Sequence, residues 1–304
     1  MRYAREAERL EPADPVVAWE LGLTQLAAGD VRGCVAPLER AVGGGARGAH
    51  AALAVAAYRR GEVTAARHHL DEVAKALAGR SEDPLARWSV ATAAAIDENL
   101  ARRQWVDRFG RSSLQRGWTE HAWDGSPVVR SEGGPVIVTG LMERPRENER
   151  PGLSRAVDGR GFHAAQAELA VQAGAETRAG LSLTFSQAKG AQGRQPKARL
   201  SVWIDVDGRV RLSVLDNFDT VLHEGLELGP VVEAGVPLRL GIERSDALNG
   251  RFVFTVDGRR TGPEVELKAL RDFRNVFELA VFAEAAPGRR ADAVISLVRI
   301  VQAP

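Results

Sequence analysis

Acidic side chains are the first residues to examine for catalysis, because two carboxylates on one face of a strand can cleave a glycosidic bond. Two pairs stand close together in the sequence, Glu224 with Glu227 and Glu264 with Glu266. The first pair lies in a turn-like segment, and the second follows Gly262-Pro263 at the edge of an expected strand. We interpret both pairs as solvated faces, so they predict no catalytic residue.

Histidine, serine and cysteine chemistry finds as little support. His68 and His69 are adjacent on an expected helix, so their side chains point about 100° apart and cannot share a metal ion. The other histidines are isolated and match no metal-ligand spacing: His50, His121, His163 and His223. The sequence contains no Gly-x-Ser-x-Gly motif and no phosphate-binding glycine loop. The single cysteine, Cys34, excludes an internal disulfide framework, and we expect a buried, unreactive thiol.

Calcium is the one metal that the acidic residues leave open. Asp205 and Asp207 stand two residues apart, and Asp216 and Asp219 follow the next expected strand, so the four carboxylates could supply oxygen ligands. Tight turns at Asp207-Gly208 and Asp216-Asn217 explain the same residues without a metal. We therefore expect no cofactor, with calcium as the alternative.

Trp203 marks the ligand-binding surface that the sequence favours. Along the expected strand 199–206, Arg199, Trp203 and Asp205 share one face, and the aliphatic side chains share the other. The polar face suggests a half-exposed tryptophan, and a glycan or partner site on this part would consist of Trp203 with Arg199, Asp205 and Arg211. The interpretation that we favour is that Trp203 packs under a loop or against the helical part. The long polar segments 143–160 and 188–198 could form a rim around the site.

The hairpin turn at Asp207-Gly208 decides which residues stand beside Trp203. A two-residue turn would pair Val206 with Arg209 and would place Arg211 on the apolar face. A bulge at Gly208 instead pairs Asp205 with Arg209 and Trp203 with Arg211. We predict the bulged register, because it pairs opposite charges and keeps Val202, Ile204, Val206, Val210, Leu212 and Val214 in the core.

The elements that must position these residues differ between the two parts of the chain. In the first third, apolar and small residues recur at helical spacing: Ala18, Leu21, Gly22 and Gln25, then Cys34, Leu38 and Ala41. Gly29 and Gly61 stand 32 residues apart, and each suits a left-handed turn between two helices. Helix pairs repeating near this period predict a solenoid.

These residues resemble the tetratricopeptide repeat, which consists of two helices. The first helix carries Leu-Gly, and the second carries a small residue, a large apolar residue and then an alanine. Leu21-Gly22 with Cys34-x3-Leu38-x2-Ala41 matches one repeat, and Ala66-x3-Leu70-x2-Val73 matches the next. The resemblance implies a concave groove that binds a protein or peptide. Residues 7–12 look like the end of a preceding repeat, so we expect the chain to be a fragment of a longer protein.

A change of hydrophobic period divides the chain. Residues 85–108, with Trp88 and Trp105, are expected to form a helix that caps the repeats. From about residue 110 the runs alternate, and Asp-Gly turns join 199–206 to 209–215 and 252–256 to 259–261. Such runs predict an antiparallel β-sandwich. We therefore expect a helical domain at residues 1–108 and an all-β domain at 109–304.

The β-rich part resembles the concanavalin A-like lectin and glucanase jelly roll, including its laminin G-like relatives. The resemblance rests on Phe109 with Gly117-Trp118, on Trp123 and Gly125, on Val256-Asp257-Gly258 and on the closing strands 282–301. It implies a face that binds a glycan or a protein. Glucanases of this fold carry three carboxylates on one strand, as Glu-x-Asp-x-x-Glu, and the sequence does not contain that spacing.

The composition excludes other classes of protein. The chain has 304 residues with 41 basic and 40 acidic side chains, so it lacks the basic excess of a nucleic-acid-binding protein. No apolar run approaches the roughly 20 residues of a membrane-spanning helix. The N-terminal segment MRYAREAERLEPAD lacks the apolar core of a secretory signal, which favours a cytoplasmic location but leaves the compartment open.

The sequence thus predicts a multidomain α plus all-β protein that is not an enzyme. In this prediction it is an interaction or scaffold protein, whose helical repeats bind a protein or peptide and whose sandwich binds a glycan or a protein surface. One alternative is a carbohydrate-active enzyme of the glycoside hydrolase type with an unrecognised acid pair. Another is a purely structural module of a larger bacterial assembly. The identity of the ligand and the oligomeric state stay open.

Overall fold

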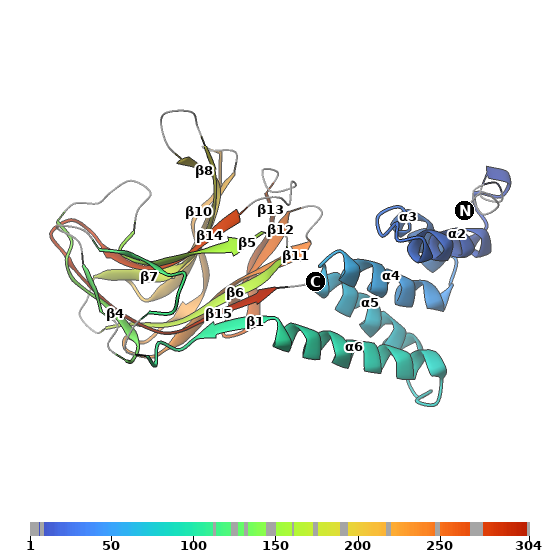
Figure 1. Ribbon diagram of the computed structural model, residues 1–304, viewed down its shortest axis with the longest axis horizontal. Coiled ribbons are helices and arrows are strands. Elements are labelled where there is room, and N and C mark those ends of the chain that lie inside the picture. The colour runs from blue at the N-terminus through green and yellow to red at the C-terminus, as the bar shows by residue number, and fades with distance from the viewer. Residues whose placement is uncertain are drawn as a thin grey trace. The chain divides into compact units, whose positions relative to one another are not determined.

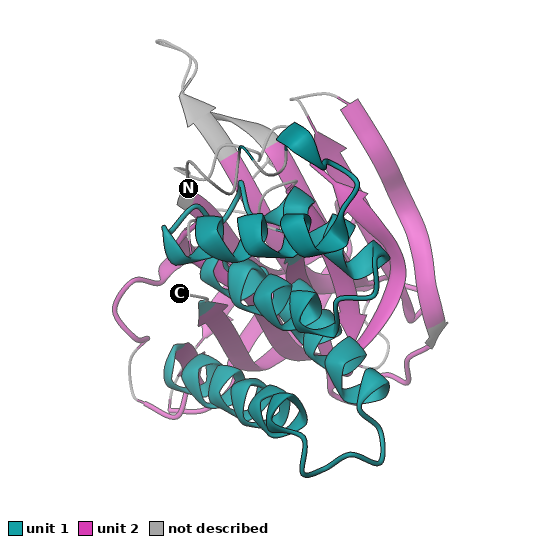
Figure 2. Cartoon of the chain, turned by 90° about the vertical axis from the view of Figure 1, so that its right-hand side faces the viewer, with its two compact units in different colours: residues 1–103, 245–247, 302–304 teal, residues 104–244, 248–301 magenta. Residues whose placement is uncertain are grey.

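The computed structural model divides the chain into two compact units (Figures 1 and 2). One comprises residues 1–103, 245–247 and 302–304, and the other comprises residues 104–244 and 248–301. The structure describes residues 6, 9–111, 114–122, 127–130, 133–143, 150–159, 161–172, 176–188, 194–216, 220–246, 250–267 and 276–302. The division falls between residues 103 and 104, a few residues before the expected boundary.

The first unit is helical. Its described helices are α2 (Pro15–Ala27), α3 (Val35–Gly43), α4 (Arg47–Arg59), α5 (Val63–Ala76) and α6 (Pro84–Arg102). Both α2 and α6 begin with a capping aspartate followed by proline: the side chain of Asp14 accepts a hydrogen bond from Val16 N, and that of Asp83 from Leu85 N. Neighbouring helices pack in pairs, α2 against α3 and α4 against α5, with α6 against α5.

Glycines set the geometry of the helix pairs. Gly29 and Gly61 adopt φ of 82° and 80°, the left-handed conformation expected at the two turns. A Cβ atom added to Gly22 would lie 2.6 Å from Leu38, so this glycine permits the close approach of α2 and α3. Cys34 directly precedes α3, makes no capping hydrogen bond with its side chain and is completely buried, as predicted. The described part contains five helices, and their assignment as tetratricopeptide-like repeats stays a prediction.

The expected capping helix is shorter than predicted. Helix α6 ends at Arg102, and residues Gln104–Asp107 form strand β1, which pairs with residues 298–301 near the end of the chain. Trp105 therefore belongs to the sandwich, where its ring lies 5.7 Å from that of Trp118 and the Arg155 guanidinium stacks on it at 4.1 Å. The four residues of β1 are too few to show a period, so only their long-range pairing reveals the strand.

The second unit is a sandwich of two antiparallel sheets, which confirms the expected all-β architecture (Figure 1). Within the described residues the first sheet has the order β13 (Arg259–Glu266), β12 (Arg251–Val256), β11 (Leu238–Asp246), β6 (Phe162–Val171), β15 (Arg290–Gln302), β4 (Val136–Leu141) and β3 (Val128–Arg130), with β1 also on β15. The second has the order β10 (Thr220–Val231), β9 (Arg209–Asp216), β8 (Arg194–Ile204), β7 (Thr177–Ala188), β14 (Val276–Ala285), β5 (Gly152–Asp158) and β2 (Thr119–His121).

Alternation along the strands separates a core face from an outer face. In the seven-stranded sheet the core side chains include Leu153, Leu181, Val202, Leu212 and Val281, all with essentially no exposed surface. The residues between them point away from the core. Phe109 and Trp118 pack at its margin with ring centroids 6.1 Å apart, whereas Trp123 and Gly125 lie outside the described residues.

Candidate functional site

The outer face of the seven-stranded sheet carries the candidate site, and the strand register orders its side chains in three rows. The first row consists of Gly152, Phe282, Gly180, Trp203 and Arg211. The second consists of Ser154, Ala280, Ser182, Ser201 and Ser213. The third consists of Ala156, Glu278, Thr184, Arg199 and Leu215. Each row runs across β5, β14, β7, β8 and β9 in that order.

The β8–β9 hairpin has the predicted register. Trp203 stands opposite Arg211, and Asp205 N donates to Arg209 O at 2.8 Å. Gly208 adopts φ of 76°, which is the conformation that favours glycine in this turn. Val206 departs from the expectation, because it is 54% exposed rather than in the core. It lies in the loop after β8 ends, where the alternation of the strand no longer applies.

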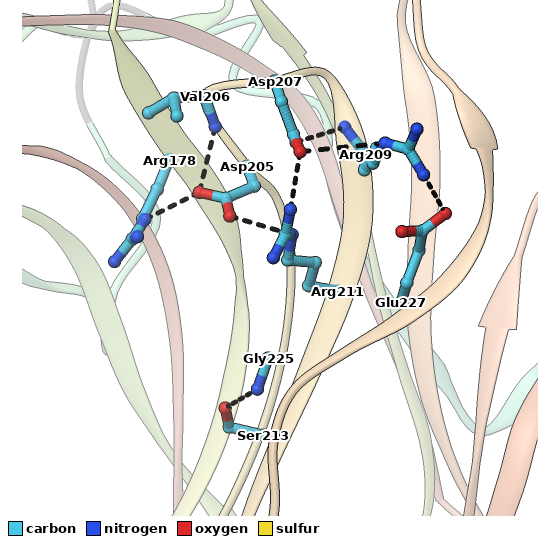
Figure 3. Close-up of polar contacts among 9 residues, drawn as sticks. All are labelled: Arg178, Asp205, Val206, Asp207, Arg209, Arg211, Ser213, Gly225 and Glu227. Carbon is cyan, nitrogen blue, oxygen red and sulfur yellow. Dashed lines mark hydrogen bonds and ion pairs between the residues drawn. The ribbon is translucent and has the colours of Figure 1, made fainter.

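Arginines bind both carboxylates near this turn (Figure 3). Asp205 accepts from Arg178 Nε at 2.7 Å and from Val206 N at 3.0 Å, and its second oxygen lies 2.9 Å from Arg211 Nε. Asp207 accepts from Arg211 Nη2 at 2.5 Å and from Arg209 N at 3.0 Å. The backbone hydrogen bond from Arg209, together with Arg211, lowers the pKa of Asp207.

Arg211 contacts both carboxylates of the calcium alternative that lie in this turn, at 2.9 Å from Asp205 and 2.5 Å from Asp207. Asp216 is buried at the end of β9, and Asp219 lies outside the described residues. Among the residues that the structure describes, no three His, Cys, Asp or Glu side chains are grouped to hold a metal ion.

Trp203 is largely buried, in agreement with the packed interpretation. It is 9% exposed, not half-exposed, although it does lie on the outer face. Gly180 makes room for it, because a Cβ atom there would lie 2.5 Å from Trp203 Cβ. On the far side of Gly180, the ring of Phe282 is covered by the Arg150 guanidinium at 4.2 Å. Within the first row Phe282 and Trp203 are therefore buried, whereas the Arg211 side chain is 30% exposed.

The third row is the accessible part of this face. Ala156 and Glu278 are exposed, and Thr184 and Arg199 are half-buried. Burial lowers the pKa of Arg199, as does the charge of Arg150, while Glu284 and Glu278 act in the opposite direction. Arg199 therefore lies within electrostatic range of Glu278. Of the four residues predicted to bind a ligand, Arg199 is the one in this accessible row.

Two exposed carboxylates lie on this part of the face. Glu278 on β14 stands opposite Ala156 on β5, and Asp158 is two residues further along the same face of β5. Diagonal neighbours on adjacent antiparallel strands have Cα atoms about 7–8 Å apart. The sequence did not reveal this pair, because the two residues are far apart in the chain and only the β5–β14 register brings them together. No local pattern could have found it.

The other carboxylates do not offer such a pair. Glu284 shares the face of β14 with Glu278, but six residues of strand place them about 20 Å apart. Glu227 forms an ion pair with Arg209, and Glu264 and Glu266 face Arg251 at 3.8 and 3.5 Å. These contacts agree with the expectation of solvated surfaces, except that Glu224 and Glu227 lie within strand β10 and not in a turn.

Comparisons with known proteins give fold likeness only. No protein family matches the sequence, and no curated protein matches it either. Among solved structures, a Crh5 transglycosylase without ligand matches with 13% identity and a TM-score of 0.46, over 67% of this chain and 86% of its own. The family GH16 endo-β-1,3(4)-glucanase SCLam matches with 12% identity and a TM-score of 0.46, over 66% of this chain and 92% of its own. A Bacillus licheniformis β-glucanase matches with 12% identity and a TM-score of 0.44, over 65% of this chain and 97% of its own.

The sequence predicts a non-enzymatic interaction or scaffold protein, whereas these three similar structures are named as a transglycosylase and two glucanases. That prediction is therefore not carried further. A likeness of this degree assigns no activity or substrate to the chain, so any activity has to be derived from its own residues. Separately, no helix within the described residues has the length and apolar character needed to cross a membrane.

Proposed function

We propose that the sandwich unit is a carbohydrate-active enzyme that cleaves or transfers a glycosidic bond, with Asp158 and Glu278 as its acid pair. The observation that carries this proposal is their placement on the same face of adjacent strands, both exposed and diagonal to each other. Glycosidases need two carboxyl groups about 5–9.5 Å apart. The diagonal spacing of about 7–8 Å between the backbones is compatible with that range.

The surroundings suggest a division of roles between the two acids. Glu278 interacts with the positive charge of Arg199, so we assign it the role of the carboxylate that activates water or attacks the anomeric carbon. Asp158 would then donate the proton to the leaving oxygen. Ala156 stands beside both, and its small side chain leaves space above the sheet for a sugar ring.

The glycan would lie along the third row of the sheet. Arg199 and Thr184 offer hydrogen-bond donors next to Glu278, which suits the hydroxyl groups of a sugar. Arg199 thereby keeps its predicted role in ligand binding. For Trp203, Asp205 and Arg211 we propose a supporting role, since Trp203 and Asp205 are buried and the Arg211 guanidinium is held by Asp205 and Asp207.

The proposal is tested by incubating the protein with glycans and measuring the release of reducing ends. The panel should contain β-1,3-glucan, mixed-linkage β-1,3-1,4-glucan and mucin O-glycans, the polymers to which the names of similar structures refer. Cleavage by the wild-type protein that is lost in Glu278→Gln and kept in Glu284→Gln supports the proposal. Binding without cleavage of any glycan, or cleavage that survives Glu278→Gln, would overturn it.

The two units are further proposed to be separate domains, helical and all-β, and the hairpins to be tetratricopeptide-like repeats that take a peptide. Support comes from the shared left-handed turns at Gly29 and Gly61 and from the close α2–α3 crossing at Gly22.

Cooperative unfolding of residues 104–301 expressed alone would support separate domains. A peptide library passed over the helical unit tests the groove, and absence of any selected peptide would count against it.

A further inference from the structure

Two histidines of the helical unit meet across the pair α4 and α5. The Nδ1 atoms of His50 and His69 lie 3.2 Å apart, with ring centroids 5.4 Å apart and ring planes inclined by 41°. Both side chains are half-buried. The fold thus brings His69 next to His50, which lies 19 residues away in the chain.

The two nitrogens lie within hydrogen-bond distance of each other, and the same separation also fits a metal site. Two imidazole nitrogens bound to one tetrahedral ion at 2.0–2.1 Å lie about 3.3–3.4 Å apart. The observed 3.2 Å is close to this value, so the ion needs only a small adjustment of the rings. We propose that His50 and His69 bind a divalent transition-metal ion of the Zn²⁺ class. Imidazole ligands favour zinc, copper or nickel over magnesium and calcium.

A cavity lies beside His50, although His69 is not part of its lining. Its volume is about 390 Å³, and its lining includes His50, Glu72, Arg47 and Lys75. Glu72 accepts a hydrogen bond from Lys75 at 2.7 Å, so a metal would compete with this lysine for the carboxylate. The described residues contain no group of three ligands, and water completes the coordination, which leaves an open site.

Calorimetric titration of the whole chain with Zn²⁺ tests the proposal, with Mg²⁺ as a control ion. The wild-type protein should bind Zn²⁺ saturably and should not bind Mg²⁺. His50→Ala and His69→Ala should each weaken the affinity by about tenfold or more. His68→Ala is the matched control, since this exposed neighbour lies outside the pair and should keep wild-type affinity.

A second measurement needs no variant. X-ray absorption of the zinc-loaded wild-type protein should show imidazole nitrogens at about 2.0–2.1 Å from the metal. Absence of saturable Zn²⁺ binding, unchanged affinity in both His50→Ala and His69→Ala, or a spectrum without imidazole ligands would each overturn the proposal. All of these readouts are independent of any activity of the sandwich.

Discussion

Arg244 donates a hydrogen bond through Nη1 to the backbone oxygen of Gly159 at 2.6 Å, which joins strand β11 of one sheet to the end of β5 in the other. Only 1% of the Arg244 surface is exposed, and the same nitrogen also reaches Phe162 O at 3.3 Å. The guanidinium lies 5.9 Å from the ring centre of Phe277. It therefore contacts the residues that directly follow Asp158 and precede Glu278.

Replacing Arg244 should therefore disturb both the fold and the acid pair. We expect Arg244→Met to lower the free energy of unfolding by about 2 kcal/mol or more, because buried carbonyl oxygens lose their donor. The measurement is urea unfolding of both proteins. Arg239→Met is the control, since Arg239 forms an exposed ion pair with Glu168 and should cost about 1 kcal/mol or less. Equal losses in the two variants would contradict the expectation.

Trp203→Ala should act mainly on stability. The indole is 9% exposed and packs beside Gly180, so its removal leaves a cavity that should cost about 3–5 kcal/mol. Thermal unfolding followed by circular dichroism measures the loss. A variant with the wild-type transition that no longer binds any glycan would show that Trp203 is a ligand residue after all.

Cys34 should be unreactive in the native protein. Burial raises the pKa of its thiol, which disfavours the reactive thiolate. A thiol reagent should therefore label it only at the rate of unfolding, and labelling should become fast in denaturant. Cys34→Ala should cost about 1 kcal/mol because it removes one buried sulfur atom. Rapid labelling without denaturant would refute this prediction.

Acid should remove the contribution of Asp207 to stability. Its pKa is lower in the folded protein than the ordinary value, so the stabilisation is fully present above the unfolded pKa of about 3.9. It is lost as the pH falls through the lower folded value. The stability difference between wild type and Asp207→Asn should thus shrink from about pH 7 to about pH 2. A difference that stays constant or grows would contradict the assignment.

Local signals predicted the parts of the fold that depend on neighbouring residues. The Asp207-Gly208 turn and the alternation on both sides were sufficient for the register that places Trp203 opposite Arg211. Gly29 and Gly61 similarly marked the turns of the helix pairs. In each case a glycine with a left-handed conformation and a short hydrophobic pattern decide the structure, and both are visible in the sequence.

Pairings between distant segments could not be predicted in this way. The expected helix 85–108 includes Gln104, because nothing nearby in the sequence shows that this residue pairs with Val301. Asp158 and Glu278, like His50 and His69, become neighbours only through the packing of whole elements. The burial of Trp203 likewise depends on Gly180 of the adjacent strand. Candidate sites built from two elements are therefore found in the structure and not in the sequence.

The acid pair is tested most directly by the kinetics of Asp158→Asn, Glu278→Gln and the double variant on a glycan that the wild-type protein cleaves. Each single substitution should lower kcat by about 100- to 10,000-fold. The double variant should lose little more than either single variant, because residues that act as a unit are not additive. Glu284→Gln should keep wild-type activity. Single variants within about tenfold of wild type, or losses that multiply in the double variant, would contradict a catalytic pair.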